Sequence, residues 1–451
     1  MMKRRHFLAS AATAALGASL RGAAAKRPPR ILLRGSWQSV NIGDIGHTPG
    51  ALRVFERHFP EAEITLWPGD LGHGSREMLV KNFPRLKIAQ GSLDAAGQPT
   101  APLAKAWADA DLLVCGSGSG MGNWHGHVHA FRAATGKPIG VLGLTTDPVS
   151  GFGPGRDPEG GTLRSLRERS RRLPPDHLSA DWRRVIDAAS FFFSRDSISL
   201  DYLRSQRVKV PVLELGPDLQ LGMHVRDDAT AAAYLQRHGL EPGKFICVLP
   251  RLRYTPYHRM RGDTQLMPDD RAKDAINART VASDHAGLRD LIVAYVNQTG
   301  HRVLACPEMT YEIALAKEQL VDPLPADVKK NVVWRDRYWL PDEAASVYAQ
   351  ALAVVSIECH SPLIALHNGT PAFHVRNPTD TCKGEMYRDF GAGDWLFEVE
   401  EASGAVLWPR LEAILRDPSA AKAKVKAIMA GIESRQRRMI EVVRATVSPL
   451  I

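Results

Sequence analysis

Short apolar runs alternate with longer helical stretches along most of this chain. In the first third, each apolar run ends in a polar or glycine-rich turn, at 31–33, 64–67, 86–88, 111–115 and 138–144. Parallel strands need long crossover connections, so strands separated by helices indicate a parallel, doubly wound sheet. Runs at 190–193 and 210–215 extend this pattern to about residue 226.

The alternation stops near Arg226 to Asp228 and then restarts. Further apolar runs lie at 245–249, 302–306, 331–334 and 353–356, and two helices are predicted from about Trp408 onward. A chain of 451 residues exceeds one ordinary core. We therefore predict two α/β domains, at 30–226 and 228–405, followed by C-terminal helices at 406–451. The cleft between the two domains is the default ligand site.

The stretch 356–371 is the most informative turn in the second domain. An apolar run from Ala351 to Ile357 ends in Glu358-Cys359-His360, and a helix is predicted from Ser361-Pro362 to Asn368-Gly369. Ligands of open α/β sheets bind at such strand-to-helix turns. An ionisable His360 beside free backbone N–H groups suits an anionic ligand.

Two turns of the first domain carry candidate ligand contacts. Asn41-Ile42-Gly43-Asp44 reads as a polar loop before a helix at 49–59, and its Asn and Asp side chains suit sugar hydroxyls. An ordinary Asx turn is the alternative. The run 116–122 does not fit the dinucleotide fingerprint, but a loop containing Gly118 and Ser119 can cradle an anion or a sugar. A tight turn without a ligand is equally compatible with it.

Two clusters of basic residues are further candidate sites. His125, His127 and His129 have no carboxylate partner at metal-ligand spacing, so no metal site is predicted there. Arg251 and Arg253 open a basic loop at a strand end, and guanidinium groups match carboxylates and phosphates. The alternative is a solvated basic loop.

Composition and the N-terminus narrow the class of protein. The hydrophobic fraction of 44% and charged fraction of 24% are typical of globular proteins. Lys3-Arg4-Arg5, an Ala-rich stretch and Ala23-Ala24-Ala25 read as a twin-arginine signal peptide at 1–25. We therefore expect a periplasmic or secreted protein with no stable membrane insertion after signal removal. Loss of the segment's four cationic residues lowers the formal net charge from +9 to +5, and no basic stripe suggests nucleic acid.

Together these stretches resemble the polysaccharide pyruvyl transferase family. The resemblance covers about 31–397 and rests on 41–44, the glycine loop at 111–120, Ser194-Arg195-Asp196, Gly216-Pro217-Asp218, and 356–371 with the later Lys383. It implies two Rossmann-like doubly wound domains facing a central cleft, in an arrangement resembling glycosyltransferase B. It also implies transfer of a pyruvyl group, from phosphoenolpyruvate or a related donor, to a glycan as a ketal, without a cofactor.

The resemblance also suggests roles for individual residues. His360 would act as general acid or base or contact phosphate, and Asp44 or Asp218 would accept a hydroxyl proton. The residues expected to bind substrate are Asn41, Gly118, Ser119, Arg195, Asp218, Arg251, Arg253 and Lys383.

One residue departs from the family motif. Glu358 stands where the family has Arg, and its charge would repel phosphoenolpyruvate. Two alternatives follow: a glycan-active hydrolase with Glu358 and His360 as its acid/base pair, or a non-catalytic periplasmic glycan-binding protein.

Overall fold

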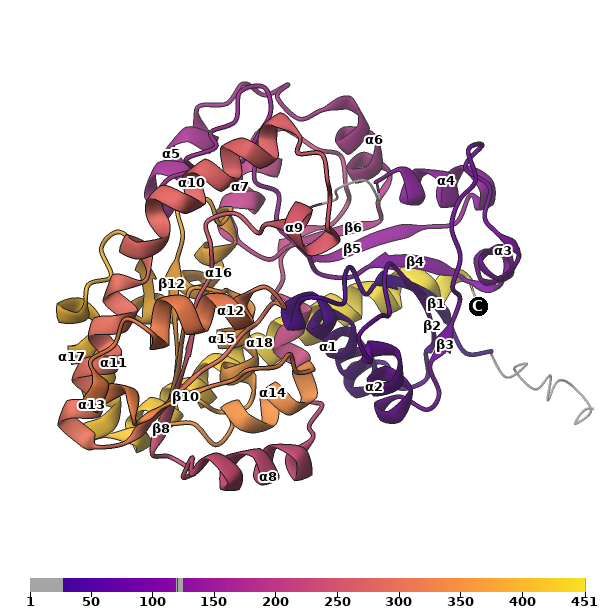
Figure 1. Ribbon diagram of the computed structural model, residues 1–451. Helices are drawn as coiled ribbons and strands as arrows, with labels where there is room; N and C mark the ends of the chain where they lie inside the picture. Colours follow the sequence, from indigo (N-terminus) through magenta and orange to yellow (C-terminus); the bar gives the residue numbers. More distant parts are fainter. Residues whose placement is uncertain (1–26, 119, 121–124, 451) are drawn as a thin grey trace, which may run out of the picture.

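The computed structural model describes residues 27–118, 120 and 125–450 and contains two parallel sheets (Figure 1). The predicted signal peptide and Ser119 lie outside the described residues. The first sheet has the strand order β3-β2-β1-β4-β5-β6-β7, and every pairing in it is parallel. Its strands are β1 (Arg30–Gly35), β2 (Glu63–Pro68), β3 (Lys87–Ile88), β4 (Leu112–Cys115), β5 (Ile139–Leu144), β6 (Phe191–Ser194) and β7 (Leu213–Leu215).

The second sheet has the order β10-β9-β8-β11-β12-β13 and is also parallel throughout. Its strands are β8 (Phe245–Leu249), β9 (Arg302–Ala305), β10 (Val332–Trp334), β11 (Ala353–Ser356), β12 (Ala372–Arg376) and β13 (Leu396–Glu398). The predicted fold class of two doubly wound α/β halves is confirmed. In each sheet the order reverses once, between β1 and β4 and between β8 and β11. These reversals mark where ligands of such sheets bind.

Helices cover the sheets and connect their strands (Figure 1). Those of the first half are α1 (Ile42–His58), α2 (Ser75–Asn82), α3 (Ala101–Asp109), α4 (His125–Thr135), α5 (Leu163–Arg171), α6 (Ala180–Ala188) and α7 (Ser197–Ser205), with a 3₁₀ turn η2 (Leu219–Gly222). Those of the second half are α8 (Asp228–His238), α9 (Tyr257–Arg261), α10 (Pro268–Asp284), α11 (Ala286–Thr299), α12 (Glu312–Ala316), α13 (Ala326–Lys329), α14 (Pro341–Tyr348), α15 (His360–His367), α16 (Met386–Asp389), α17 (Gly404–Arg416) and α18 (Pro418–Val447). Among the described residues, none of these helices combines the length and apolarity that crossing a membrane requires.

The helix α1 begins earlier than the sequence suggested. The predicted start at Pro49 is wrong, because the Asn41 side chain accepts hydrogen bonds from the N–H groups of Gly43 and Asp44 and so caps a helix at Ile42. Pro49 lies inside this helix. The stretch expected to be a loop is therefore the cap and first turn of α1.

Three glycines on one face of α1 allow it to approach its neighbours closely. A Cβ at Gly43 would lie 2.5 Å from Nδ1 of His360, and one at Gly50 would lie 2.1 Å from the Leu219 carbonyl oxygen. A Cβ at Gly46 would lie 2.6 Å from Nε2 of Gln220. Because these positions lack side chains, α1 packs directly against η2 and α15.

The C-terminal helix α18 connects the two halves. It runs across the molecule from α17, beside the second sheet, to α1 (Figure 1). Its Arg438 pairs with Glu214 at 2.7 Å, and Arg444 pairs with Glu61. Its apolar face belongs to a core cluster that includes residues of both sheets.

The segment after β8 contacts the first half of the chain. The basic loop predicted there is wrong in part, because it runs into the helices α9 and α10. The Tyr254 hydroxyl donates to the Pro158 carbonyl at 2.6 Å, and its ring lies 5.3 Å from that of Phe152. These contacts join the second half to the loop at 147–161 of the first half.

Candidate functional site

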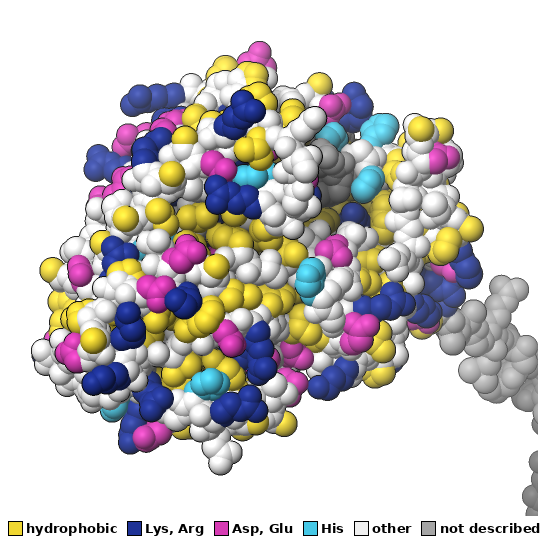
Figure 2. Space-filling view, in the orientation of Figure 1, with side chains coloured by type: hydrophobic (Ala, Val, Ile, Leu, Met, Phe, Trp, Pro, Cys, Tyr) yellow, Lys and Arg dark blue, Asp and Glu magenta, His cyan; other side chains and the backbone are white. Residues whose placement is uncertain are grey.

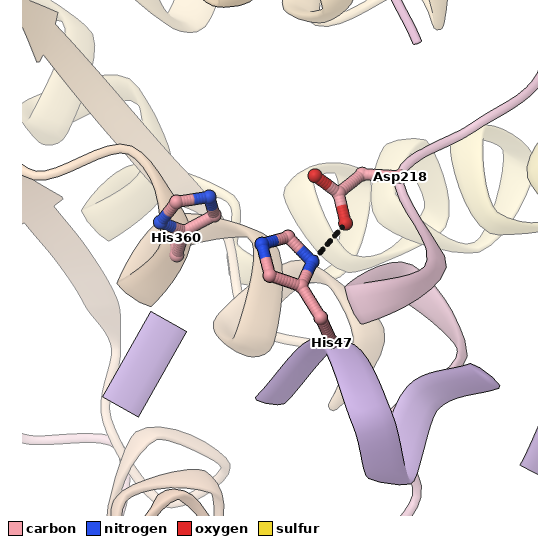
Figure 3. Close-up of side chains that lie close together, drawn as sticks. All are labelled: His47, Asp218 and His360. Carbon is pink, nitrogen blue, oxygen red and sulfur yellow. Dashed lines mark hydrogen bonds and ion pairs between the residues drawn. The ribbon is translucent and has the colours of Figure 1, made fainter. Parts of the chain in front are cut away.

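Side chains from three distant segments meet where α1, η2 and α15 converge (Figure 3). His47 lies on α1, Asp218 caps η2, and His360 is the first residue of α15. Nδ1 of His47 lies 2.9 Å from a carboxylate oxygen of Asp218, and the two imidazole rings are 5.1 Å apart, edge to face. Their exposed fractions are 2%, 0% and 5%, so the cluster is enclosed.

Asp218 is held by several donors. Besides His47, one oxygen lies 3.0 Å from the Ser117 hydroxyl and 2.9 Å from the backbone N of Gln220. The other oxygen accepts from Arg195, whose Nε donates to the Thr145 hydroxyl at 2.7 Å. Burial opposes the charged form, but His47 and Arg195 hold the pKa of Asp218 well below its usual range.

His360 has a carboxylate partner of its own. Its Nδ1 lies 3.3 Å from one oxygen of Glu308, whose other oxygen accepts from the N–H of Ser361 at 2.6 Å. Burial, together with Lys383 and His47, lowers the pKa of His360 to about 3, so its imidazole is neutral at pH 7. The helix N-terminus that the sequence offered to an anionic ligand therefore already binds a carboxylate of the chain.

The two histidines are arranged in the same way. Each has Nδ1 beside a buried carboxylate, Asp218 for His47 and Glu308 for His360. Nε2 of each is buried and has no hydrogen-bond partner among the described residues. In the neutral ring of His360, Nε2 can accept a proton from a substrate hydroxyl, and Nε2 of His47 is positioned in the same way.

His47, Asp218 and His360 lie close enough together to hold a metal ion. Both oxygens of Asp218 are already engaged by His47, Ser117, Gln220 and Arg195, which leaves it little capacity to coordinate metal. The remaining two imidazoles are fewer ligands than zinc sites provide. The donor set therefore fits proton transfer better than metal binding.

A network of buried charges adjoins this cluster, at the point where the second sheet reverses its order. Arg251, after β8, lies 3.2 Å from Glu358 and 2.8 Å from Asp380. Asp380 also pairs with Lys383 at 2.7 Å. Although burial favours its neutral form, Arg251 and Lys383 hold the pKa of Asp380 well below its usual range.

Neighbouring groups offset the negative charge of Glu358. Burial raises its pKa, and it shares a hydrogen bond with Glu312, whose pKa burial and the Glu358 charge raise well above the usual range. Two adjacent buried carboxyl groups cannot both ionise easily, so their proximity favours the protonated form of one of them. With Arg251 beside it, Glu358 does not act as the isolated repelling charge that the sequence suggested.

Three further predicted residues lie outside the cluster of His47, Asp218 and His360. Asn41 caps α1, and Asp44 accepts from Gln38, whose amide also bonds the Tyr257 hydroxyl at 3.0 Å. Gly118 exchanges backbone hydrogen bonds with the end of β5, at 3.3 Å to Gly143 and 3.1 Å from Thr145.

The structure does not bring Arg253 into the cluster. Its guanidinium is engaged by Asp284 through two bonds of 2.8 Å and by Glu400 at 2.9 Å. The other basic residues of that segment also have acidic partners: His258 and Arg259 with Asp274, and Arg261 with Asp263. A role for Arg253 in binding substrate stays a prediction.

His47 and Glu308 are the site residues that the sequence did not single out. The glycines at 43, 46 and 50 recur at helical spacing, and a helix capped by Asn41 would have placed His47 on the same face. Glu308 lies just after β9, and its position at the end of a strand could have marked it as a candidate site residue.

Comparison with known proteins adds to this geometry. A family model described as polysaccharide pyruvyl transferase matches residues 41–378. No curated protein matches the chain in sequence.

Among solved structures, S. aureus MnaA in a co-structure with UDP has 12% identity and a TM-score of 0.54, over 92% of this chain and 96% of that one. UDP-GlcNAc 2-epimerase from Neisseria meningitidis, bound to UDP-GlcNAc, has 10% identity and a TM-score of 0.51, over 92% and 99%. At these identities the likeness concerns the fold, and it agrees with two Rossmann-like domains facing a cleft.

Proposed function

Since the chain belongs to the polysaccharide pyruvyl transferase family, we propose that it transfers a pyruvyl group, from phosphoenolpyruvate or a related donor, to a glycan as a ketal. The observation that carries this proposal is the pair of buried imidazoles, each oriented by its own carboxylate.

A ketal needs two proton acceptors. Carbon 2 of the donor forms bonds to two sugar oxygens while its bond to the phosphate oxygen breaks. Both hydroxyl protons leave: one equivalent reaches the donor methylene, which becomes a methyl group, and the other leaves with phosphate. His47 and His360 face each other across the cluster and are proposed to accept these two protons (Figure 3).

The charged residues around the two imidazoles constrain which donor can bind. Arg195 has one buried nitrogen, Nη2, without a hydrogen-bond partner among the described residues, so it is the best-placed cation for the donor carboxylate or phosphate. Arg251 and Lys383 are already neutralised by Glu358 and Asp380. This balance favours a donor with fewer negative charges than phosphoenolpyruvate, or one that displaces Asp380 on binding.

The test is turnover by the purified protein. Phosphoenolpyruvate and a panel of saccharides would be supplied, with release of phosphate and the ketal methyl signal in NMR as readouts. We expect His47→Ala and His360→Ala each to lower kcat by roughly 10²- to 10⁴-fold, the usual contribution of a general base. The control is His224→Ala, an exposed histidine outside the cluster, which should keep full activity. No turnover on the whole panel, with no donor binding in calorimetry, would reject the proposal.

A hydrolytic reaction is the second candidate, and the raised pKa of the adjacent carboxyl groups Glu312 and Glu358 favours it. A protonated carboxyl group can act as general acid toward a glycosidic or ketal oxygen, with His360 as its partner base. Glu358→Gln would abolish hydrolysis of a substrate found by screening. Unchanged hydrolysis by this variant would exclude the pair.

The proposed site of action is outside the cytoplasm, by way of the twin-arginine signal at 1–25. Replacing Arg4 and Arg5 by Lys should retain the protein in the cytoplasm with its N-terminus uncleaved. Sequencing of the mature N-terminus in cell fractions would check this.

A further inference from the structure

Arg34 is a buried cation that forms no ion pair with any carboxylate of the described residues. It lies near the carboxyl end of β1, in register with Cys115 of β4, where the order of the first sheet reverses. Its side chain is sandwiched between aromatic rings, 5.3 Å from the Trp37 centroid and 5.0 Å from that of Trp67. With 7% exposure, it pays the desolvation cost of a charge without an ion pair.

The hydrogen bonds of Arg34 leave one edge of the guanidinium available. Nη1 donates to the carbonyl oxygens of Gly35 at 3.3 Å and Trp67 at 3.1 Å. Nε is buried without a partner. Both hydrogen bonds that the guanidinium donates to described residues come from Nη1, so Nη2 has no described acceptor. Nε and Nη2 form the edge that binds a carboxylate through two parallel bonds, as Arg253 does with Asp284.

A second polar group without a described partner lies beside Trp67 and Arg34. His127 stacks on Trp67 at 5.3 Å, and its buried Nδ1 has no partner among the described residues. Burial and the nearby Arg34 lower the pKa of His127, so the ring is a neutral hydrogen-bonding group. On this face, histidine side chains gather near the start of α4 (Figure 2).

The same cluster is connected to the proposed active site through one residue. The Trp37 indole N–H donates to the Ser117 carbonyl at 2.7 Å, and the Ser117 hydroxyl lies 2.7 Å from Nδ1 of His47. A ligand bound at Arg34 would thus lie near the proposed active site, to which Trp37 and Ser117 connect it. The switch point of the first sheet is where such a ligand is expected.

We propose that Arg34, flanked by Trp37 and Trp67, binds an anionic group carried on a sugar, through its Nε and Nη2 edge. The inference rests on the proposed function only in taking the ligand to be part of the saccharide substrate. A carboxylate would make that substrate an acidic glycan, and a phosphate would make it a sugar phosphate.

Binding, measured without turnover, tests this inference. Glucuronate, galacturonate and glucose 6-phosphate would be titrated into the purified protein by calorimetry, with glucose and galactose as uncharged counterparts. We expect at least one anionic sugar to bind on the order of tenfold more tightly than its neutral counterpart, as for a charged hydrogen bond. Selectivity for the uronates would indicate a carboxylate, and selectivity for the phosphate would indicate a sugar phosphate.

Variants separate the guanidinium edge from charge in general. Arg34→Gln should remove the preference for the anion, and Arg34→Lys should lose most of it, because an ammonium group cannot form the paired bonds. The control is Arg164→Gln, whose side chain is 87% exposed beside Glu168. His360→Ala should keep the preference, so the result is readable even if no pyruvyl transfer is found. Equal binding of charged and neutral sugars, no binding of any, or a preference that survives in folded Arg34→Gln would overturn the inference.

Discussion

At the scale of single residues, the site depends on positions that carry no side chain. Gly43 faces the His360 ring at a distance that a Cβ atom cannot occupy. A methyl group there must push α15 away from α1 or rotate His360, and either change separates the two imidazoles.

Gly43→Ala should therefore lower activity by at least about tenfold, because small displacements of catalytic groups are costly. The overpacking should also reduce stability by about 1–3 kcal/mol. Gly431→Ala is the matched control, since Gly431 lies in α18 with nothing within 4 Å of an added Cβ. That change should leave activity intact and stabilise the helix by about 0.5–1 kcal/mol. Equal kinetics for the two variants would contradict the packing argument.

Asp218 links the site to acid stability. Its folded pKa is depressed, so its contribution is present above the unfolded pKa of about 3.9 and is lost as pH falls below it. Asp218→Asn should cost about 3–5 kcal/mol at pH 7, since it leaves the buried Arg195 unpaired. Urea unfolding of both proteins between pH 7 and pH 3 measures the difference, which should shrink toward the acid end. A constant difference would show that Asp218 is not charged in the folded state.

Residue identities alone did not reveal how the charges pair. Arg251 and Arg253 looked like free anion-binding groups because the sequence shows only their basic neighbours. The partners of Arg251 lie more than a hundred residues further along, as Asp380 does. Likewise His47 meets Asp218 across 171 positions, so no local pattern reports the contact.

At the scale of elements, most strands were predictable, whereas β12, β13 and some helices were not. Strands such as β4 and β6 are continuous buried apolar runs, as parallel sheets require, and the sequence displays them directly. The helix α10 was missed because its residues are mostly polar, and α1 was shortened because Pro49 was taken for its start. The strand-to-helix turn at 358–360 was placed correctly, with α15 starting one residue earlier than expected.

The N-cap of α1 connects an element to the site. Asn41→Ala removes the acceptor for two backbone N–H groups and should cost about 1 kcal/mol. Because this turn supports Gly43 against His360, kcat should fall as well. Asp227→Ala, at the cap of α8, is the matched control: a similar loss of stability with unchanged kcat. Thermal denaturation with steady-state kinetics would compare them, and equal effects on kcat would deny α1 this role.

At the scale of the whole molecule, α18 packs against both halves, and we expect it to couple their unfolding. Its buried residues, among them Val425, Ile432 and Met439, join the core cluster that spans both sheets. Basic and acidic side chains are interspersed over the face in Figure 2, which is consistent with the many surface ion pairs. Such exposed pairs contribute little each, so the apolar contacts of α18 should dominate the coupling.

Truncation after Asp417 should separate the unfolding of the halves. Without α18 the first sheet loses its cover beside α1, and hydrogen exchange should show peptides of the two sheets opening at different urea concentrations. Removal of 448–451 alone, beyond α18, should preserve a single transition. Coincident transitions in the longer truncation would show that the interface between halves is sufficient without the helix.

The position of α18 after both sheets also orders events during synthesis. Residues 418–447 leave the ribosome only after the strands of both sheets have emerged. Until then the first half has an uncovered apolar face, and nothing from α18 holds α1 and α15 together. We therefore expect the two imidazoles to reach their final spacing only after residues 418–447 have left the ribosome, so that the proposed active site forms late in synthesis.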